Sequence, residues 1–172
     1  MRSIKLLLII ILAATFTACH TSRKGNSRSY TIMLYKDLRK ELGDAEVKRR
    51  GDTVRIIYPE LAMFDFGKSV IKPEALPAFG RFSAVLKNYD RIYFYINGYT
   101  DNVGTDDVNL SLSRDRAMSA KTLLEGNGIN GGRMMTNGMG SSNPIMSNTT
   151  PDGRQANRRV EFVLYENKSL RK

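Results

Sequence analysis

The 172-residue sequence has few of the side chains on which metal binding and nucleophilic catalysis depend. It contains one cysteine and one histidine, Cys19 and His20, which are adjacent near the start of the chain, and no tryptophan. A single cysteine excludes a disulfide within the chain, and the isolated Cys-His pair leaves a serine, cysteine or histidine-cluster mechanism without partners. At 41% hydrophobic residues, the composition is that of a globular domain. We therefore expect no resident metal and no cofactor.

Long apolar runs are also scarce, and the longest lies at the N-terminus. Arg2 and Lys5 precede an apolar stretch over residues 6–14, and small residues lead to Cys19. The stretch is shorter than the roughly 20 residues of a membrane span, and its flanks are those of a bacterial secretory signal. The residues before Cys19 resemble a lipobox, although Phe16 replaces a small aliphatic residue. The sequence thus predicts a signal peptide over 1–18, acylation of Cys19 (for example by palmitate) and a flexible polar linker over 19–29.

Acidic residues are outnumbered, with 17 Asp and Glu against 27 Lys and Arg, which gives a net charge of +10. Removal of residues 1–18 takes away Arg2 and Lys5 and no acid, and so lowers the charge to +8. Nucleic acid is a common partner of basic proteins, but we do not expect it for an exported protein. The excess is spread over the linker and a basic tail at 167–172. Anionic head groups or an anionic polymer are the favoured partners, and a solvated basic surface without a partner stays open.

From residue 30 onward the hydrophobic pattern alternates between helical and strand periodicity. It predicts helices over 33–42, from 73 to 86, and from Ser111 or Ser113 to 125. Strands are predicted at five places, with a Gly51-Asp52 turn joining the first two: 45–50, 53–58, 91–99, 133–139 and 159–165. The expected fold is α+β, with two helices packed on one face of a mixed sheet. We expect residues 30–51 to form an N-terminal helix and the start of a hairpin, and 52–166 to form the main domain.

The most informative segment follows the third predicted strand. Asp101 stands at the C-terminal end of this strand, where loops of open sheets often hold ligands, and Gly104 permits a tight turn. Ser113 or Ser111 is a candidate N-cap, which would direct free helix amides to the same place. Arg116 lies on the apolar face of the following helix and needs an anionic partner. Two hypotheses stay open: a zwitterionic ligand bound between Asp101 and Arg116, or an ion pair between these two side chains.

Four blocks of sequence, in order along 52–166, have the spacing of a known family. They are Phe64-Asp65-Phe66-Gly67-Lys68-Ser69, then Gly98-Tyr99-Thr100-Asp101 followed by 109–117, then Gly138-Met139-Gly140-Ser141, and finally 153–161. This region resembles the OmpA-like C-terminal domain, a peptidoglycan-binding module also found in peptidoglycan-associated lipoproteins (Pal) and flagellar stator proteins. The resemblance implies a βαβαβ-type two-layer sandwich with a mixed sheet and helices on one face. The helix near 33–42 has no counterpart in it.

In that family the domain binds the diaminopimelate side chain of the peptidoglycan stem peptide, whose free end has both an amine and a carboxylate. The resemblance implies charged contacts through Asp101 and Arg116. It implies backbone contacts or a bracing role at four further positions, which are Phe66, Gly67, Leu112 and Asn109. Gly67 stands where Pal-type members have an aspartate, so only backbone contact is left there. We expect mainly structural roles for Arg158 and Arg159.

The resemblance thus implies a non-catalytic lipoprotein of the outer membrane that faces the periplasm and ties the membrane to the wall. Docking of a periplasmic protein, through helix 33–42 or the wall site itself, is the alternative. An uncovered apolar patch on that helix would favour it. Two other interpretations fail: the acidic loop 101–107 lacks the spacing of an EF-hand, and Asp65 with Asp101 lacks a general acid for hydrolysis.

Overall fold

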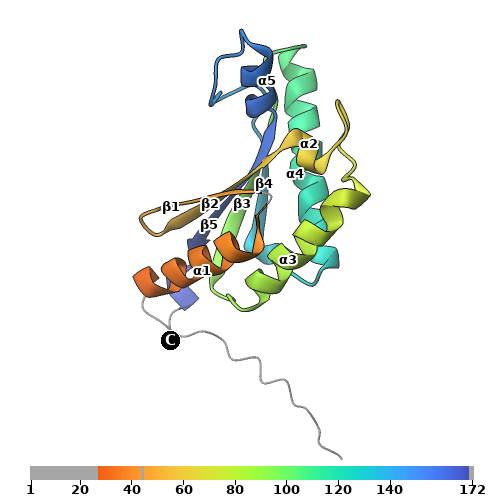
Figure 1. Cartoon of the computed structure of the whole chain (residues 1–172). Helices are drawn as coiled ribbons and strands as arrows, with labels where there is room; N and C mark the ends of the chain where they lie inside the picture. The colour runs from red at the N-terminus through yellow and green to blue at the C-terminus, as the bar shows by residue number, and fades with distance from the viewer. Residues whose placement is uncertain (1–26, 44, 171–172) are drawn as a thin grey trace, which may run out of the picture.

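The computed structural model describes residues 27–43 and 45–170, which form one sheet and the helices that cover it (Figure 1). The predicted signal peptide, Cys19 and most of the linker lie outside the described residues, as do the last two residues of the basic tail. The helices are α1 (Ser27–Glu41), α2 (Glu60–Met63), α3 (Leu76–Lys87), α4 (Asp106–Gly126) and α5 (Pro151–Asn157). Within the described part of the chain, no helix has both the length and the hydropathy needed to cross a bilayer.

Five strands form one mixed sheet: β1 (Glu46–Arg50), β2 (Thr53–Pro59), β3 (Ile92–Tyr99), β4 (Met134–Gly138) and β5 (Arg159–Glu166). Their order is β1-β2-β5-β3-β4, in which all neighbours are antiparallel except β3 and β4. Successive residues of a strand point to opposite faces. On β3 the buried residues Phe94 and Ile96 pair with Leu164 and Phe162 of β5, so all four lie on one face. The predicted α+β class with a mixed sheet is confirmed.

The buried face of the sheet is covered by α1, α3 and α4, which Figure 1 shows along the sheet. Aromatic rings fill the space between the layers. Phe82 of α3 lies edge-on to Phe162 of β5 with ring centroids 5.2 Å apart, and Phe79 stacks on Tyr58 at 5.9 Å. Each such side chain contributes about 1.5–3 kcal/mol when fully buried. The sequence predicted two helices on this face, and α1 is a third.

The apolar face of α1 is an integral part of this core. Leu34, Leu38 and Leu42 are buried in the same cluster as the sheet residues. The uncovered patch that would favour partner docking through this helix is therefore not formed by these residues. Because α1 begins at Ser27, the linker predicted over 19–29 ends earlier than expected.

The start of α1 is fixed to the N-terminal end of β3. The Tyr30 hydroxyl donates to Asp90 at 3.2 Å, and the Arg91 guanidinium lies 4.0 Å from the centre of the Tyr30 ring. Burial is the main reason that the pKa of Tyr30 is raised. These contacts place the first turns of α1 beside the residues that enter β3, at the opposite end of this strand from Asp101.

α4 approaches the sheet closely because glycine occupies two strand positions beneath it. At Gly98 of β3, an added Cβ would overlap the carbonyl oxygen of Ser113, and at Gly138 of β4 it would lie 2.7 Å from the carbonyl oxygen of Leu110. The Gly140 amide donates to the Ser113 hydroxyl at 2.9 Å, which ties α4 to the loop after β4.

The start of α4 differs from the prediction, and two short helices were not predicted. Thr105 caps α4, with its hydroxyl accepting from the Val108 amide at 3.4 Å, so the N-cap predicted at Ser111 or Ser113 is wrong. In the first turn of α4, Asp106, Asp107 and Val108 are exposed and the buried residue, Asn109, is polar, so this turn adds no buried apolar residue to the periodicity that marked the helix. The short helices α2 and α5 were not predicted, because four and seven residues make too few turns for a periodic pattern.

Replacing Leu38 by alanine should lower the free energy of unfolding by about 2–5 kcal/mol, because it opens a cavity between α1 and the sheet. Urea unfolding followed by circular dichroism measures this change. Lys36→Ala, an exposed position of the same helix, is the control and should change stability by about 0.5 kcal/mol or less. Equal unfolding curves for the two variants would show that α1 is not part of the core.

Gly98→Ala should destabilise the protein by about 1–3 kcal/mol or more, since the new methyl group meets the α4 backbone and not a movable side chain. The matched control is Gly80→Ala in α3, where an added Cβ has no atom within 4 Å. There alanine should stabilise the helix by roughly 0.5–1 kcal/mol. Thermal unfolding midpoints that shift in the same direction for both variants would contradict the close packing of α4.

Candidate functional site

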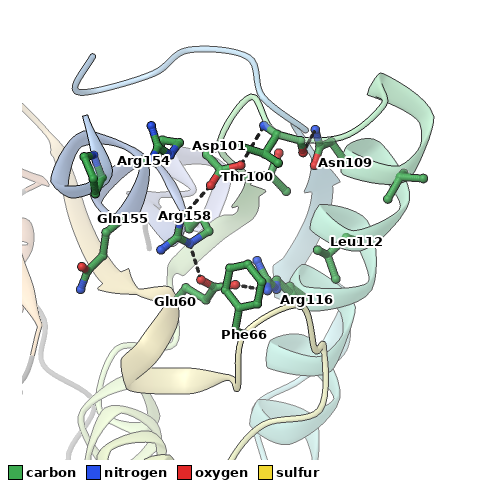
Figure 2. Close-up of a pocket in the computed structure, with 14 residues that line it drawn as sticks. Glu60, Phe66, Thr100, Asp101, Asn109, Leu112, Arg116, Arg154, Gln155 and Arg158 are labelled. Atoms are coloured by element: carbon green, nitrogen blue, oxygen red, sulfur yellow. Dashed lines mark hydrogen bonds and ion pairs between the residues drawn. The ribbon is translucent and has the colours of Figure 1, made fainter. Parts of the chain in front are cut away.

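A pocket of about 460 Å³ lies where β3 ends, between α4, α5 and the segment that includes α2 (Figure 2). All six residues that the sequence implied for ligand binding line it: Phe66, Gly67, Asp101, Asn109, Leu112 and Arg116. Further lining residues, to which the sequence analysis assigned no part in ligand binding, include Glu60, Thr100, Arg154, Gln155 and Arg158.

Four charged side chains form a chain of ion pairs across this pocket. The Arg116 guanidinium pairs with one carboxylate oxygen of Glu60, and Nε of Arg158 donates to the other at 2.6 Å. Nη1 of Arg158 donates to Oδ2 of Asp101 at 2.7 Å. Figure 2 shows Arg158 between the two acids, with Arg116 on the far side of Glu60. Two acids and two bases make the chain neutral as a whole.

The inner half of this chain is almost fully buried, and its outer half is less deeply buried, with the Asp101 side chain 10% exposed. The side chains of Arg116 and Glu60 are 1% and 2% exposed, whereas that of Arg158 is 17% exposed. Burial lowers the pKa of Arg116, and the Glu60 carboxylate partly offsets the effect. Burial also acts to lower the pKa of Arg158, but hydrogen bonds to Asp101 and Glu60 outweigh it and raise that pKa. Both groups stay protonated, since a guanidinium does not lose its proton in proteins.

Arg116 also holds the loop that forms one wall of the pocket. Its Nε donates to the carbonyl oxygen of Lys68 at 2.9 Å, and its guanidinium lies 5.4 Å from the centre of the Phe64 ring. With Glu60 on its other side, the side chain is anchored at two points. Arg116 is therefore a structural part of the pocket as well as a source of positive charge.

The loop between β3 and α4 fixes the position of Asp101. Oδ1 of Asp101 accepts from the Val103 amide at 2.9 Å, and the Asn109 amide group donates to the Val103 carbonyl at 3.1 Å. Gly104 has a φ of 94°, which a side chain would disfavour. Asn109 thus braces the loop, and the loop orients the Asp101 carboxylate toward Arg158.

The pocket combines apolar surface with a hydroxyl group that has no hydrogen-bond partner among the described residues. Phe66 is 72% exposed, and the Arg158 guanidinium lies 5.5 Å from the centre of its ring. Gly67 has a φ of 69°, so the backbone turns sharply beside the ring. The buried Thr100 hydroxyl has no hydrogen-bond partner among the described residues, and Leu112 adds an apolar wall. Such a pocket offers charge, polar groups and one aromatic face to a small ligand.

The ion pairs of the structure differ from the Asp101–Arg116 pair that the sequence left open. Asp101 and Arg116 do not neutralise each other, because Asp101 pairs with Arg158 and Arg116 with Glu60. Arg158 lines the pocket and also pairs with Glu60 and Asp101, so the expectation that its role is mainly structural stays a prediction. Arg159 fits a structural role, because its Nε is paired with Glu161 at 2.8 Å. The sequence did contain one signal for Glu60, an acidic residue within the largely apolar run 56–64.

Other kinds of site find no support in the described residues. Among them, no group of three or more His, Cys, Asp or Glu side chains comes together as a metal site requires. Asp65 does not line the pocket with Asp101, so the two do not form a hydrolytic pair there. Asp106 and Asp107 are exposed in the first turn of α4, where acidic residues stabilise a helix.

Known proteins resemble this chain over parts of its length. The probable lipoprotein YiaD of Escherichia coli (strain K12) is 37% identical over 118 residues, which are 69% of this chain and 54% of YiaD. The peptidoglycan-binding protein ArfA of Mycobacterium bovis is 51% identical over 69 residues, 40% of this chain and 21% of ArfA. The chain therefore spans about half the length of YiaD and a smaller part of ArfA.

A solved structure and a family match extend this likeness to the fold. The crystal structure of a MotB-like protein from Desulfovibrio vulgaris superposes with a TM-score of 0.77, covers 82% of this chain and 97% of that protein, and is 22% identical. At that identity the likeness concerns the fold alone. Residues 63–158, more than half of the chain, match the OmpA family and include both Asp101 and Arg158. The chain belongs to the OmpA family.

Proposed function

We propose that this protein is a non-catalytic lipoprotein that binds peptidoglycan and so tethers the outer membrane to the cell wall. One observation supports it above all: Asp101 and two guanidinium groups line one accessible pocket, next to backbone and hydroxyl groups. The name of ArfA, a relative with 51% identity over 69 residues, describes a peptidoglycan-binding protein. The proposed ligand is the diaminopimelate residue of the stem peptide.

The free end of diaminopimelate is complementary to this arrangement. Its ammonium group would bind Asp101 and the nearby Thr100 hydroxyl, and its carboxylate would lie on the cationic side of the pocket with the backbone of Phe66 and Gly67. Each charge-assisted hydrogen bond contributes about 1.5–3 kcal/mol. A few such contacts give weak single-site binding. Many copies on one polymer would hold firmly through avidity.

The geometry of the domain suits a tether. Tyr30, near the start of α1, contacts the residues before β3, whereas Asp101 follows the end of that strand. Figure 1 shows the beginning of α1 at the opposite end of the sheet from α5. A lipid at Cys19 would therefore hold one end of the domain near the membrane and leave the pocket directed into the periplasm, toward the wall.

Replacing Asp101 by asparagine should weaken binding to peptidoglycan by roughly ten- to a hundredfold, because the charge that binds the ammonium group is lost while the shape is kept. Co-sedimentation of residues 20–172 with purified insoluble peptidoglycan measures this. The matched control is Asp107→Asn, which removes an exposed charge six residues away. If the Asp101→Asn protein sediments with peptidoglycan to the same extent as the Asp107→Asn protein, the proposed site is wrong.

Arg116→Ala should lower the free energy of unfolding by about 3–5 kcal/mol, since it removes one partner of a buried ion pair. Arg114→Ala, an exposed position of the same helix, should be nearly neutral. Urea titration distinguishes the two variants. A fully stable Arg116→Ala protein would contradict the structural role of this side chain and make Arg116 a ligand contact alone.

A further inference from the structure

Arg158 occupies the place on Asp101 that a ligand ammonium group would need. Its Nη1 donates to Oδ2 of Asp101 at 2.7 Å, and the other carboxylate oxygen already accepts from the Val103 amide at 2.9 Å. Both oxygens of Asp101 are thus engaged within the protein. Each oxygen keeps a further lone pair, but a second cation at Asp101 would lie beside the guanidinium already held there, and their like charges oppose binding of both.

We propose that the ligand ammonium group displaces Arg158 from Asp101, and that the released guanidinium arm takes up the ligand carboxylate. This inference rests on the proposed function and names a specificity residue for that same pocket. Through this exchange of ion pairs, Arg158 makes the site selective for the amino acid end of a ligand, in which amine and carboxylate share one carbon. Simple amines and simple acids are rejected.

The contacts of Arg158 suit such an exchange. Its Nε donates to Glu60 at 2.6 Å, which provides a fixed point about which the Nη1 arm can turn. The residue follows the last turn of α5 and is partly exposed, with the ring of Phe66 beside it. Arg116 cannot act in the same way, because Glu60 and the Lys68 carbonyl hold it and it is buried.

Charge balance explains the selectivity. Glu60, Asp101, Arg116 and Arg158 sum to zero, and a zwitterion keeps that sum while it provides a new partner for both Asp101 and Arg158. A plain amine would release Arg158 with no anion to accept it and would bring a second positive charge beside it. A plain carboxylate would draw Arg158 away and leave Asp101 without its cation. Unpaired charge in a partly buried pocket is costly in both cases.

The test compares three probes of matched shape by isothermal titration calorimetry with residues 20–172, which include every described element of the fold. The probes are meso-diaminopimelate, 1,5-diaminopentane, which lacks both carboxylates, and heptanedioate, which lacks both amines. The wild-type protein should bind diaminopimelate at least about tenfold more tightly than either of the others. Arg158→Gln should weaken the binding of diaminopimelate and strengthen that of 1,5-diaminopentane by about threefold each, so that a preference of about tenfold disappears.

Controls separate specificity from folding and from the proposed function. Glutamine can still donate to Glu60, Arg158→Lys should restore part of the preference, and Arg114→Gln on the exposed side of α4 should leave it unchanged. If Arg158→Gln weakens the binding of all three probes equally, or keeps the wild-type preference for diaminopimelate, the proposed exchange is wrong. The proposal that the protein binds the wall is then unaffected. If the wild-type protein binds neither diaminopimelate nor peptidoglycan, the proposed function and the exchange fail together.

Discussion

The buried carboxylate of Glu60 is the interaction on which the rest of the pocket depends. It accepts from Arg116 of α4 on one side and from Arg158 at the end of α5 on the other. The Glu60 amide also donates to the Arg158 carbonyl at 2.9 Å. One side chain thus joins three segments that are far apart in sequence. A buried carboxylate is costly unless it is paired, and Arg116 and Arg158 together balance the charge of Glu60.

The two ion pairs of this pocket differ in how deeply they are buried. The inner pair of Glu60 and Arg116 is withdrawn from solvent and holds the loop at Lys68. The outer pair of Arg158 and Asp101 is less deeply buried, and its geometry is set by the bracing of the loop by Asn109. In our proposal, stability depends mainly on the inner half of the chain of ion pairs, and recognition of the ligand on the outer half.

Much of the fold and part of the site could be predicted from the sequence, for identifiable reasons. The strands were evident because hydrophobic residues alternate or run together in the sequence, as in 92–96, although burial in β3 alternates. Asp101 was evident because it follows such a strand. The start of α4 was missed because its first turn has no apolar face. The partners of Asp101 and Arg116 could not be read from spacing, because Glu60 lies 56 residues before Arg116 and 98 before Arg158. Which distant charges meet is decided by the packing of the core.

The most direct measurement of the central claim is co-sedimentation of the protein with two walls that differ in one chemical group. One peptidoglycan contains diaminopimelate in its stem peptide, and the other contains lysine, which keeps the amine and lacks the carboxylate beside it. We predict strong sedimentation with the first wall and at least about tenfold weaker binding to the second. Equal binding to both walls would contradict recognition of a zwitterion by Asp101 and the arginines of this pocket.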